Sequence, residues 1–344
     1  MKHIIGAIPA ERPLQAKIVH VGEDCTGQRL DNFLLRTLKG VPKTHVYRII
    51  RSGEVRVNKG RASADSRVEA GDAVRLPPVR IPERVAHKVQ EMAQGAVGKS
   101  ARAFPILFED DWLLALDKPA GVAVHGGSGV SFGVIEQLRM SRPGAVFLEL
   151  VHRLDRETSG ILLVAKRGSA LKKLQDQFRG RDIGKTYLAL VQGRWSASKK
   201  VLDKPLYKYL IGANAETGAG ERRVRVVSVD DPNGRHSLTL VKVRQFYPAG
   251  FSMLEVTLKT GRTHQIRVHL ASEGHPIAGD DKYGDFELNK ALRRSATGPG
   301  LDRMFLHAWR LQFNHPFSGE RVELTAELPA ELQAFVTHVE HTCV

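Results

Sequence analysis

Two apolar runs flank a short polar segment near the middle of the chain. Val146–Val151 and Ile161–Ala165 are strongly hydrophobic, and runs of this length are typical of buried strands. Asp155 lies in the polar turn that joins them. An acidic residue in such a turn is often a turn former or a helix N-cap, but two rigid strands can also hold it against a ligand. The hydrophobic pattern alone leaves both interpretations open.

A helical pattern occupies the first part of the chain. Leu30, Phe33, Leu34 and Leu38 recur at helical spacing, and Gly40 is expected to end this helix. The residues that follow predict a second short helix after position 42, then strands at 54–58 and 73–76, with a turn at 59–60. We therefore expect a small module with two helices.

From residue 104 onward, apolar strands alternate with turns rich in Gly and Asp. We expect a helix around residues 171–178, an exposed hairpin loop at 211–223 and a helix that Gly274 ends. The expected strands cover 185–191, 237–243, 254–258, 305–308 and 311–313. Because strands and helices mix without regular βαβ spacing, the pattern predicts an α+β fold with a mixed, mainly antiparallel sheet and flanking helices.

These patterns suggest five segments. Residues 1–18 are expected to form a flexible arm, 19–80 the small module, 81–103 a linker, 104–334 the large domain and 335–344 a tail. The stretch at 81–103 is polar, and it follows several prolines, as linkers often do.

The charge balance indicates a polyanionic partner. The 344 residues include 52 Lys and Arg against 37 Asp and Glu, a net charge of +15. Nucleic acids and anionic membranes both attract such a protein. No apolar run approaches the ~18–20 residues that cross a bilayer, so nucleic acid is the better expectation. The two cysteines, Cys25 and Cys343, lack the spacing of a metal site, which favours a reduced cytoplasmic protein.

Basic residues are concentrated in the small module. Between Arg29 and Arg61 there are nine basic residues and two acidic ones, a net charge of +7. Most charged runs are merely solvated, but one sign dominates here, which favours a phosphate-binding face. The candidate RNA-binding residues are Arg29, Lys43, Arg48, Arg51, Arg56 and Lys59.

Four histidines in the second half of the chain raise the question of a metal site. They are His264, His269, His275 and His307. The first two are five residues apart, which is not the i, i+4 spacing of a helical zinc pair, and no cysteine joins them. We expect hydrogen-bonding or RNA-contacting histidines and no metal.

Several motifs together resemble one enzyme family. His-Arg-Leu-Asp at 152–155, followed by Arg-Glu-Thr-Ser-Gly, resembles the active-site signature of the RluA-type pseudouridine synthases. Segments 185–189, 261–269 and 305–308 resemble later motifs of that family, in the family's order. Residues 21–80 resemble the S4 RNA-binding module, and segments 38–43, 124–129 and 131–136 resemble the RluC branch.

The resemblance implies a pseudouridine synthase fold with an N-terminal S4 domain. It also implies an enzyme that isomerises three uridines of bacterial large-subunit (23S) ribosomal RNA, or its precursor, without a cofactor. By resemblance, Asp155 is the nucleophile or stabilises charge, Arg267 pairs with it, and Tyr187 packs on the target base and can take the C5 proton. Arg153 would fill the space that a flipped uridine leaves. Further substrate-binding candidates are His152, Arg262 and His264.

Two other functions stay open at this point. The chain could be an RNA-binding protein whose catalytic body is inactive. It could also be a nucleoside or glycoside hydrolase, for which Glu157 or Asp117 would supply the second carboxylate. We expect no membrane partner and a monomer, because RNA can cover the basic surfaces. The route of attack, at C1′, at C6 or through a glycal, is open too.

Overall fold

The computed structural model describes residues 15–38, 41, 43–79, 104–126, 133–212, 221–294 and 298–341. The chain divides into two compact units, residues 1–101 and 102–344. Residues 1–14 of the expected arm and the whole expected linker at 81–103 lie outside the described residues. Most of the expected loop at 211–223 also lies outside them.

The first unit packs two helices on short strands. The helices are α1 (Leu30–Thr37) and α2 (Lys43–Arg51), and a 3-10 turn η1 (Glu23–Cys25) precedes them. One sheet has the order β1 (Lys17–His20), β5 (Ala73–Leu76), β3 (Arg56–Val57), while β2 (Gln28–Arg29) pairs with β4 (Arg67–Val68). Leu30, Phe33, Leu34, Val46 and Ile49 are buried in its core. The helical spacing therefore predicted both helices correctly.

Two expectations for this unit need correction. Strand β1 begins at Lys17 and pairs with β5, so the last two residues of the expected arm belong to the sheet. The strand expected at 54–58 shortens to Arg56–Val57, because Asn58 and Lys59 adopt left-handed backbone angles (φ 49° and 67°) and form the turn. The Asn58 side chain stabilises this turn by accepting a hydrogen bond from the Ala73 backbone N–H at 2.9 Å.

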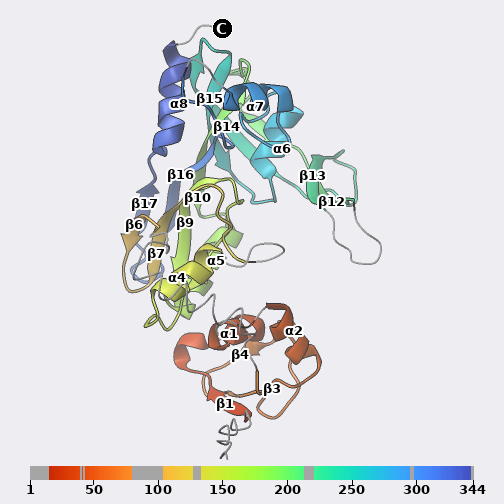
Figure 1. Ribbon diagram of the computed structural model, residues 1–344, viewed down its shortest axis with the longest axis vertical. Coiled ribbons are helices and arrows are strands. Elements are labelled where there is room, and N and C mark those ends of the chain that lie inside the picture. The colour runs from red at the N-terminus through yellow and green to blue at the C-terminus, as the bar shows by residue number, and fades with distance from the viewer. Residues whose placement is uncertain are drawn as a thin grey trace, which may run out of the picture. The chain divides into compact units, whose positions relative to one another are not determined.

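The second unit is built on a ten-stranded sheet (Figure 1). Its main path runs β11 (Val201–Asp203), β14 (Leu238–Tyr247), β15 (Phe251–Leu258), β10 (Gly184–Gln192), β16 (Leu306–Asn314), β9 (Ser159–Ala165), β7 (Leu113–Lys118) and β6 (Ile106–Glu109). Strand β17 (Arg321–Thr325) pairs with β16, and β8 (Glu149–Leu150) pairs with β9. Among the described pairs only β16 and β9 are parallel. The prediction of a mixed, mainly antiparallel sheet is confirmed.

Helices flank this sheet, and one hairpin extends from it. The helices are α4 (Val134–Ser141), α5 (Gly168–Gly180), α6 (Gln265–Ser272), α7 (Phe286–Arg293) and α8 (Ala330–His341). Strands β12 (Leu206–Ile211) and β13 (Glu221–Val226) form a two-stranded hairpin that projects beside α6 (Figure 1). In the described parts of the chain, no helix is long and apolar enough to span a membrane.

Three boundaries of the second unit differ from expectation. Residues 335–341 of the expected tail belong to α8, because Phe335, Val336 and Val339 are buried against the main core. The apolar run before Asp155 contributes only the short strand β8, and Val146 is 63% exposed. The two late strands are one continuous strand, β16.

Candidate active site

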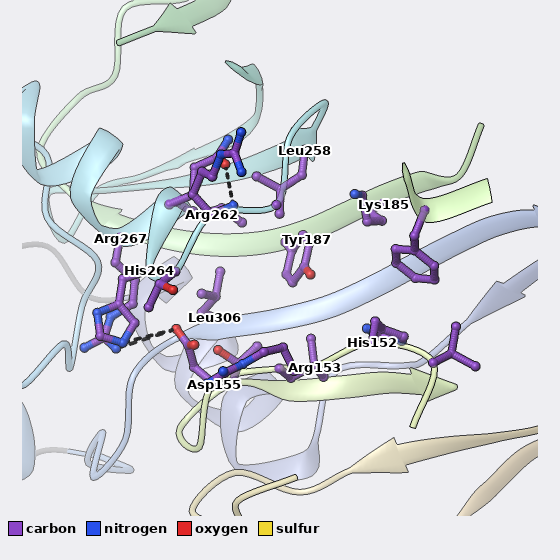
Figure 2. A pocket seen from close by; sticks show the side chains of 18 residues that line it. His152, Arg153, Asp155, Lys185, Tyr187, Leu258, Arg262, His264, Arg267 and Leu306 are labelled. Carbon is purple, nitrogen blue, oxygen red and sulfur yellow. Dashed lines mark hydrogen bonds and ion pairs between the residues drawn. The ribbon is translucent and has the colours of Figure 1, made fainter. Parts of the chain in front are cut away.

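All seven predicted catalytic and substrate-binding residues line one open cavity of about 310 Å³ (Figure 2). Its walls come from residues 151–158 before β9, from α5 and the start of β10, from residues 258–267, and from Leu306 of β16. Among the described residues that line it, Asp155 is the one carboxylate. The fold thus brings together segments that lie more than a hundred residues apart.

A buried lysine fixes the loop that carries Asp155. Lys118, at the end of β7, is fully buried and donates hydrogen bonds to the carbonyls of Pro119 and Val122 at 2.8 Å and of Arg156 at 3.1 Å. Burial lowers the pKa of its ammonium group. The sequence pattern did not single this lysine out, although a charged residue directly after an apolar strand was a usable signal.

The Gly at the end of the signature lets two strands meet. Gly160 has a φ of +105°, and a Cβ atom there would lie 2.3 Å from the Ala308 carbonyl oxygen. Only glycine therefore fits where β9 runs beside β16. Next to it, the Ser159 hydroxyl lies 2.8 Å from Nδ1 of the buried His307. This contact places the Asp155 loop against the start of β16.

The guanidinium group of Arg267 lies next to Asp155 but is bound mainly to Asp280. Its Nε and Nη2 donate to the two Asp280 oxygens at 2.7 and 2.6 Å, and Nη2 also donates to Asp281 at 3.2 Å. The closest approach to Asp155 is 3.8 Å, from Nη1 to Oδ2, which is an ion pair and not a hydrogen bond. Burial alone would lower the pKa of Arg267, but Asp280 raises it above its ordinary value. Asp280 thus holds Arg267 in place, and the sequence did not single it out.

His264 approaches the same carboxylate from the N-terminus of α6. Its Nε2 lies 3.9 Å from Asp155 Oδ2, and its Nδ1 lies 2.8 Å from the Tyr283 hydroxyl (Figure 2 shows the contact with Asp155). Its backbone is left-handed, with φ 53°. Burial lowers its pKa, with Asp155 opposing the shift, so the neutral imidazole predominates at pH 7.

Tyr187 presents its ring to the cavity from β10. Burial, and then the negative charge of Asp155, raise the pKa of the phenol, which is therefore protonated at neutral pH. Among the described residues none forms a hydrogen bond with its hydroxyl. Both the ring and the hydroxyl are thus available to a ligand.

The remaining predicted residues divide between wall and rim. His152 Nε2 accepts a hydrogen bond from the Leu163 backbone N–H at 3.0 Å, its ring stacks on Phe178, and burial lowers its pKa to about 3. It is therefore a neutral wall residue. Arg153 and Arg262 are exposed at the rim, where Arg262 Nε donates to the His236 carbonyl at 3.2 Å.

The turn before α6 depends on a further buried residue, Gln265. Its Oε1 accepts hydrogen bonds from the Thr260 hydroxyl at 2.8 Å and the Arg262 backbone N–H at 3.0 Å, and its Nε2 donates to Thr239 on β14. A buried amide with all these partners fixes the path of the chain that presents His264.

The four histidines considered for metal binding have separate partners. His269 contacts Thr239 and the Lys204 carbonyl, and His275 contacts the Gln192 carbonyl. Within the described ranges, no group of three or more His, Cys, Asp or Glu is placed to hold a metal ion.

The carboxylates considered for a hydrolase lie off the cavity. Glu157 is 3.5 Å from Arg156 Nε, and Asp117 is on β7. Neither belongs to the described lining of the cavity. A second carboxylate opposite Asp155 is therefore absent from the described walls, which disfavours two-carboxylate glycoside hydrolysis.

In the first unit, the candidate RNA-binding residues differ in how they are held. Arg29 donates two hydrogen bonds to the buried Asp31, at 3.1 and 2.8 Å. Arg48, Arg51 and Lys59 are exposed, Arg56 is half-buried and Lys43 begins α2.

Comparison with known proteins decides the family. The model of the RNA pseudouridylate synthase family matches residues 112–272, and that of the S4 domain matches residues 28–74. The chain is 50% identical over 317 residues to the ribosomal large subunit pseudouridine synthase C of Escherichia coli (strain K12), covering 92% of this chain and 94% of that protein. The chain belongs to the RluA-type family of pseudouridine synthases.

Other relatives agree with this assignment. The synthase is 49% identical over 321 residues to the protein of the same name from Pasteurella multocida (strain Pm70), with 92% of each chain covered. Among solved structures, it resembles Human RNA Pseudouridylate Synthase Domain Containing 1 at 27% identity and a TM-score of 0.52, covering 71% of this chain and 97% of that one. The predicted pseudouridine synthase fold and the S4 domain are confirmed.

Proposed function

We propose that this synthase converts uridine to pseudouridine in large-subunit ribosomal RNA. The observation that carries the proposal is the single carboxylate of the described cavity walls, Asp155, placed beside Arg267 and within the electrostatic reach of Tyr187. Relatives whose names describe them as acting on the ribosomal large subunit match more than nine-tenths of both chains. The S4 domain supports an RNA substrate.

The reaction needs little beyond a positioned carboxylate. Pseudouridine formation breaks the N1–C1′ bond, turns the uracil and rejoins it through C5. It is an isomerisation with no net redox change, so atoms and electrons balance without a co-reactant. Asp155 would act as the nucleophile at C1′ or C6, or would stabilise the charge of a glycal route. Arg267, held by Asp280, offsets the cost of keeping that carboxylate in a partly enclosed site.

Tyr187 is suited to act after Asp155. In the free site the Asp155 charge is one of the two causes that raise the phenol pKa. If Asp155 forms a covalent bond to the nucleotide, its negative charge disappears and that contribution ends. The phenol pKa then falls, so the phenol proton passes more easily to solvent, and the resulting phenolate oxygen can accept the C5 proton at the stage when that proton must leave. Before that stage, the ring is a surface on which the base can pack.

The rim and the first unit would handle the RNA. A uridine inside a helix must leave the stack to reach Asp155, and Arg153 is exposed at the rim, where it can fill the vacated space. The basic face of the S4 domain would hold the phosphate backbone. We further propose three uridine targets, a cytoplasmic location and a monomeric state.

The decisive experiment maps pseudouridine in large-subunit rRNA. Cells that lack the protein should lose specific pseudouridines, and the wild-type gene should restore them, whereas Asp155→Asn should not. An unchanged map in the deletion strain would overturn the substrate assignment. Restoration by Asp155→Asn would overturn the role of the carboxylate, and release of free uracil from the RNA would favour a hydrolase.

A further inference from the structure

A chain of polar contacts connects the β12–β13 hairpin to the catalytic carboxylate. The backbone N–H of Val224 on β13 donates to the Tyr283 hydroxyl oxygen at 3.0 Å. That hydroxyl lies 2.8 Å from His264 Nδ1, and His264 Nε2 lies 3.9 Å from Asp155 Oδ2. Residues from four segments between positions 155 and 283 thus form a continuous series of polar contacts that ends at Asp155.

The direction of these hydrogen bonds defines the protonation of His264. The Tyr283 oxygen already accepts a hydrogen bond from Val224, and among the described residues the phenol proton has no other acceptor than His264 Nδ1. If Nδ1 carried the proton instead, the phenol proton would be left without a partner in a half-buried site. Nδ1 is therefore the acceptor, and the ring proton of the neutral imidazole is on Nε2.

The other end of the ring favours the same tautomer. Nε2 faces the negatively charged Asp155, so an N–H there is attracted, whereas a lone pair would be repelled. Both His264 and Arg267 make their closest approach to Oδ2 of Asp155. Together they orient the carboxylate by this one oxygen, which leaves the other to meet the nucleotide.

Two further features show that this arrangement is held under constraint. His264 has a left-handed backbone (φ 53°), which a non-glycine residue adopts at an energetic cost that local structure must offset. Tyr283 is itself fixed: Arg223 on β13 donates to the Lys282 carbonyl, and Lys282 Nζ pairs with Glu221 at 2.7 Å. The hairpin thus holds Tyr283 where it meets His264.

We propose that Tyr283 is a positioning residue that fixes His264 as the Nε2–H tautomer facing Asp155. The proposal rests on the proposed function for the reaction that Asp155 performs. The tautomer itself is a property of the free protein, so it can be tested without that reaction.

The first test reads the tautomer directly. Proteins labelled with 15N-histidine are compared by ring nitrogen–proton correlation spectra, and His264→Gln assigns the His264 signals. We expect wild-type Nε2 to be protonated and Nδ1 to be a hydrogen-bonded acceptor, and Tyr283→Phe to show a mixture of tautomers. A protonated Nδ1 in the wild type overturns the proposal, whether or not the variant folds; an unchanged tautomer in folded Tyr283→Phe does so too.

The second test separates positioning from binding. With RNA that carries tritium at uridine C5, Tyr283→Phe should lower kcat about tenfold and change KM by no more than about twofold. The matched control is Tyr247→Phe, which removes a phenol oxygen from a tyrosine at the far end of β14, outside the cavity lining, and should change neither constant. An unchanged kcat in Tyr283→Phe, or a rise in KM alone, contradicts the proposal.

A pair of substitutions at His264 sharpens this result. The glutamine amide N–H can occupy the position of Nε2, and the asparagine amide that of Nδ1, so His264→Gln should retain at least about fivefold more activity than His264→Asn. Equal losses would contradict the tautomer role.

The pH dependence gives an independent readout. The charged groups that face His264 are Asp155 on its loop, Arg267 on α6, and Asp280 and Lys282 after it. Tyr283→Phe removes the hydrogen bond that favours the neutral ring, so the acid limb of kcat should move to higher pH, and an unmoved limb would contradict the proposal. If the wild-type protein forms no pseudouridine, the proposed function is refuted, but the tautomer measurement remains valid.

Discussion

The first unit, residues 1–101, holds the S4 domain and is called the S4 unit here; the second, residues 102–344, is called the catalytic unit. In the S4 unit, Arg51 and Lys59 are exposed, and the described residues offer neither of them an ion-pair partner. In the catalytic unit, Arg267 is 3% exposed and donates two hydrogen bonds to Asp280, which is 1% exposed. The first arrangement leaves charge free to meet phosphate groups, whose positions on an RNA surface can vary. The second fixes one cation to within hydrogen-bond geometry, 3.8 Å from the Asp155 carboxylate that we propose reacts. An exposed cation thus suits the RNA binding that we propose for the first of these units, and a cation held in place by a buried carboxylate suits the orienting role that we propose for Arg267.

Among the changes that compare the two units, removing the phenol oxygen of Tyr187 should have the largest effect. Tyr187→Phe keeps the ring in the cavity but removes the group that we expect to accept the C5 proton. Turnover should fall by about 100-fold or more, the usual contribution of a positioned acid or base. Tritium release from C5-labelled RNA measures this loss, with Tyr247→Phe as the control. Turnover within about threefold of wild type would show that Tyr187 only packs on the base.

Acid should destabilise the catalytic unit before the S4 unit. Burial lowers the pKa of His307 to about 4 and of His152 to about 3, below their ordinary value of 6.5. Their stabilising contribution is therefore fully present above pH 6.5 and is lost as the pH falls from 6.5 toward the folded-state values. Each histidine should lower the free energy of unfolding by about 1.4 kcal/mol per pH unit in that window.

The S4 unit should respond at lower pH. The hydrogen bonds from Arg29 and Tyr47 outweigh burial and lower the pKa of Asp31 below 3.8, so the stability it supplies is present above that value and is lost below it. All three tryptophans lie in the catalytic unit, so their fluorescence in urea reports that unit alone. Labelling of the buried Cys25, in a Cys343→Ser background, reports the S4 unit. For the catalytic unit, His307→Gln should reduce the slope of the free energy of unfolding against pH by about 1.4 kcal/mol per pH unit. An unchanged slope would refute the contribution assigned to His307.

Charge removal from the S4 unit should have the smallest effect. Arg51→Ala and Lys59→Ala should each weaken RNA binding by a few-fold. Each should also reduce the slope of log binding constant against log salt concentration by about one, with kcat unchanged. Lys290→Ala on α7 is the matched control for the loss of one exposed charge. A large fall in kcat at saturating RNA would mean that Arg51 and Lys59 help to position the nucleotide in the site. The distinction between binding residues in one unit and site residues in the other would then be wrong.

Local patterns predicted most of the elements. The spacing of Leu30, Phe33 and Leu34 placed α1, and the uninterrupted apolar run at 161–165 placed β9, which is buried along its whole length. Where the pattern failed, longer-range contacts decided the outcome. The run at 146–151 forms little strand, since β8 pairs with β9 over two residues only. Residues 335–341 of the expected tail are part of α8, because the sheet offers a core for their apolar side.

The sequence predicted which residues line the site, but it did not predict the contacts that hold them in place. The motif order identified Asp155, Tyr187 and Arg267, and all three line the cavity. Lys118 and Asp280 were missed, because a lysine after a strand and an aspartate in a glycine-rich turn are common in any chain. Their importance depends on which backbone carbonyls and which guanidinium they face.

The sequence by itself determined the family, the α+β organisation, the excess of basic charge and the choice of Asp155 as the candidate reacting carboxylate. Each of these follows from residue order or from composition, which the chain carries before it folds. The tertiary structure alone decided that Arg267 binds Asp280 more closely than Asp155, that His152 is bound to β9, and that Tyr283 faces His264. Such partnerships depend on ångström-scale distances between segments far apart in sequence, and only the packing of the sheet and helices sets those distances.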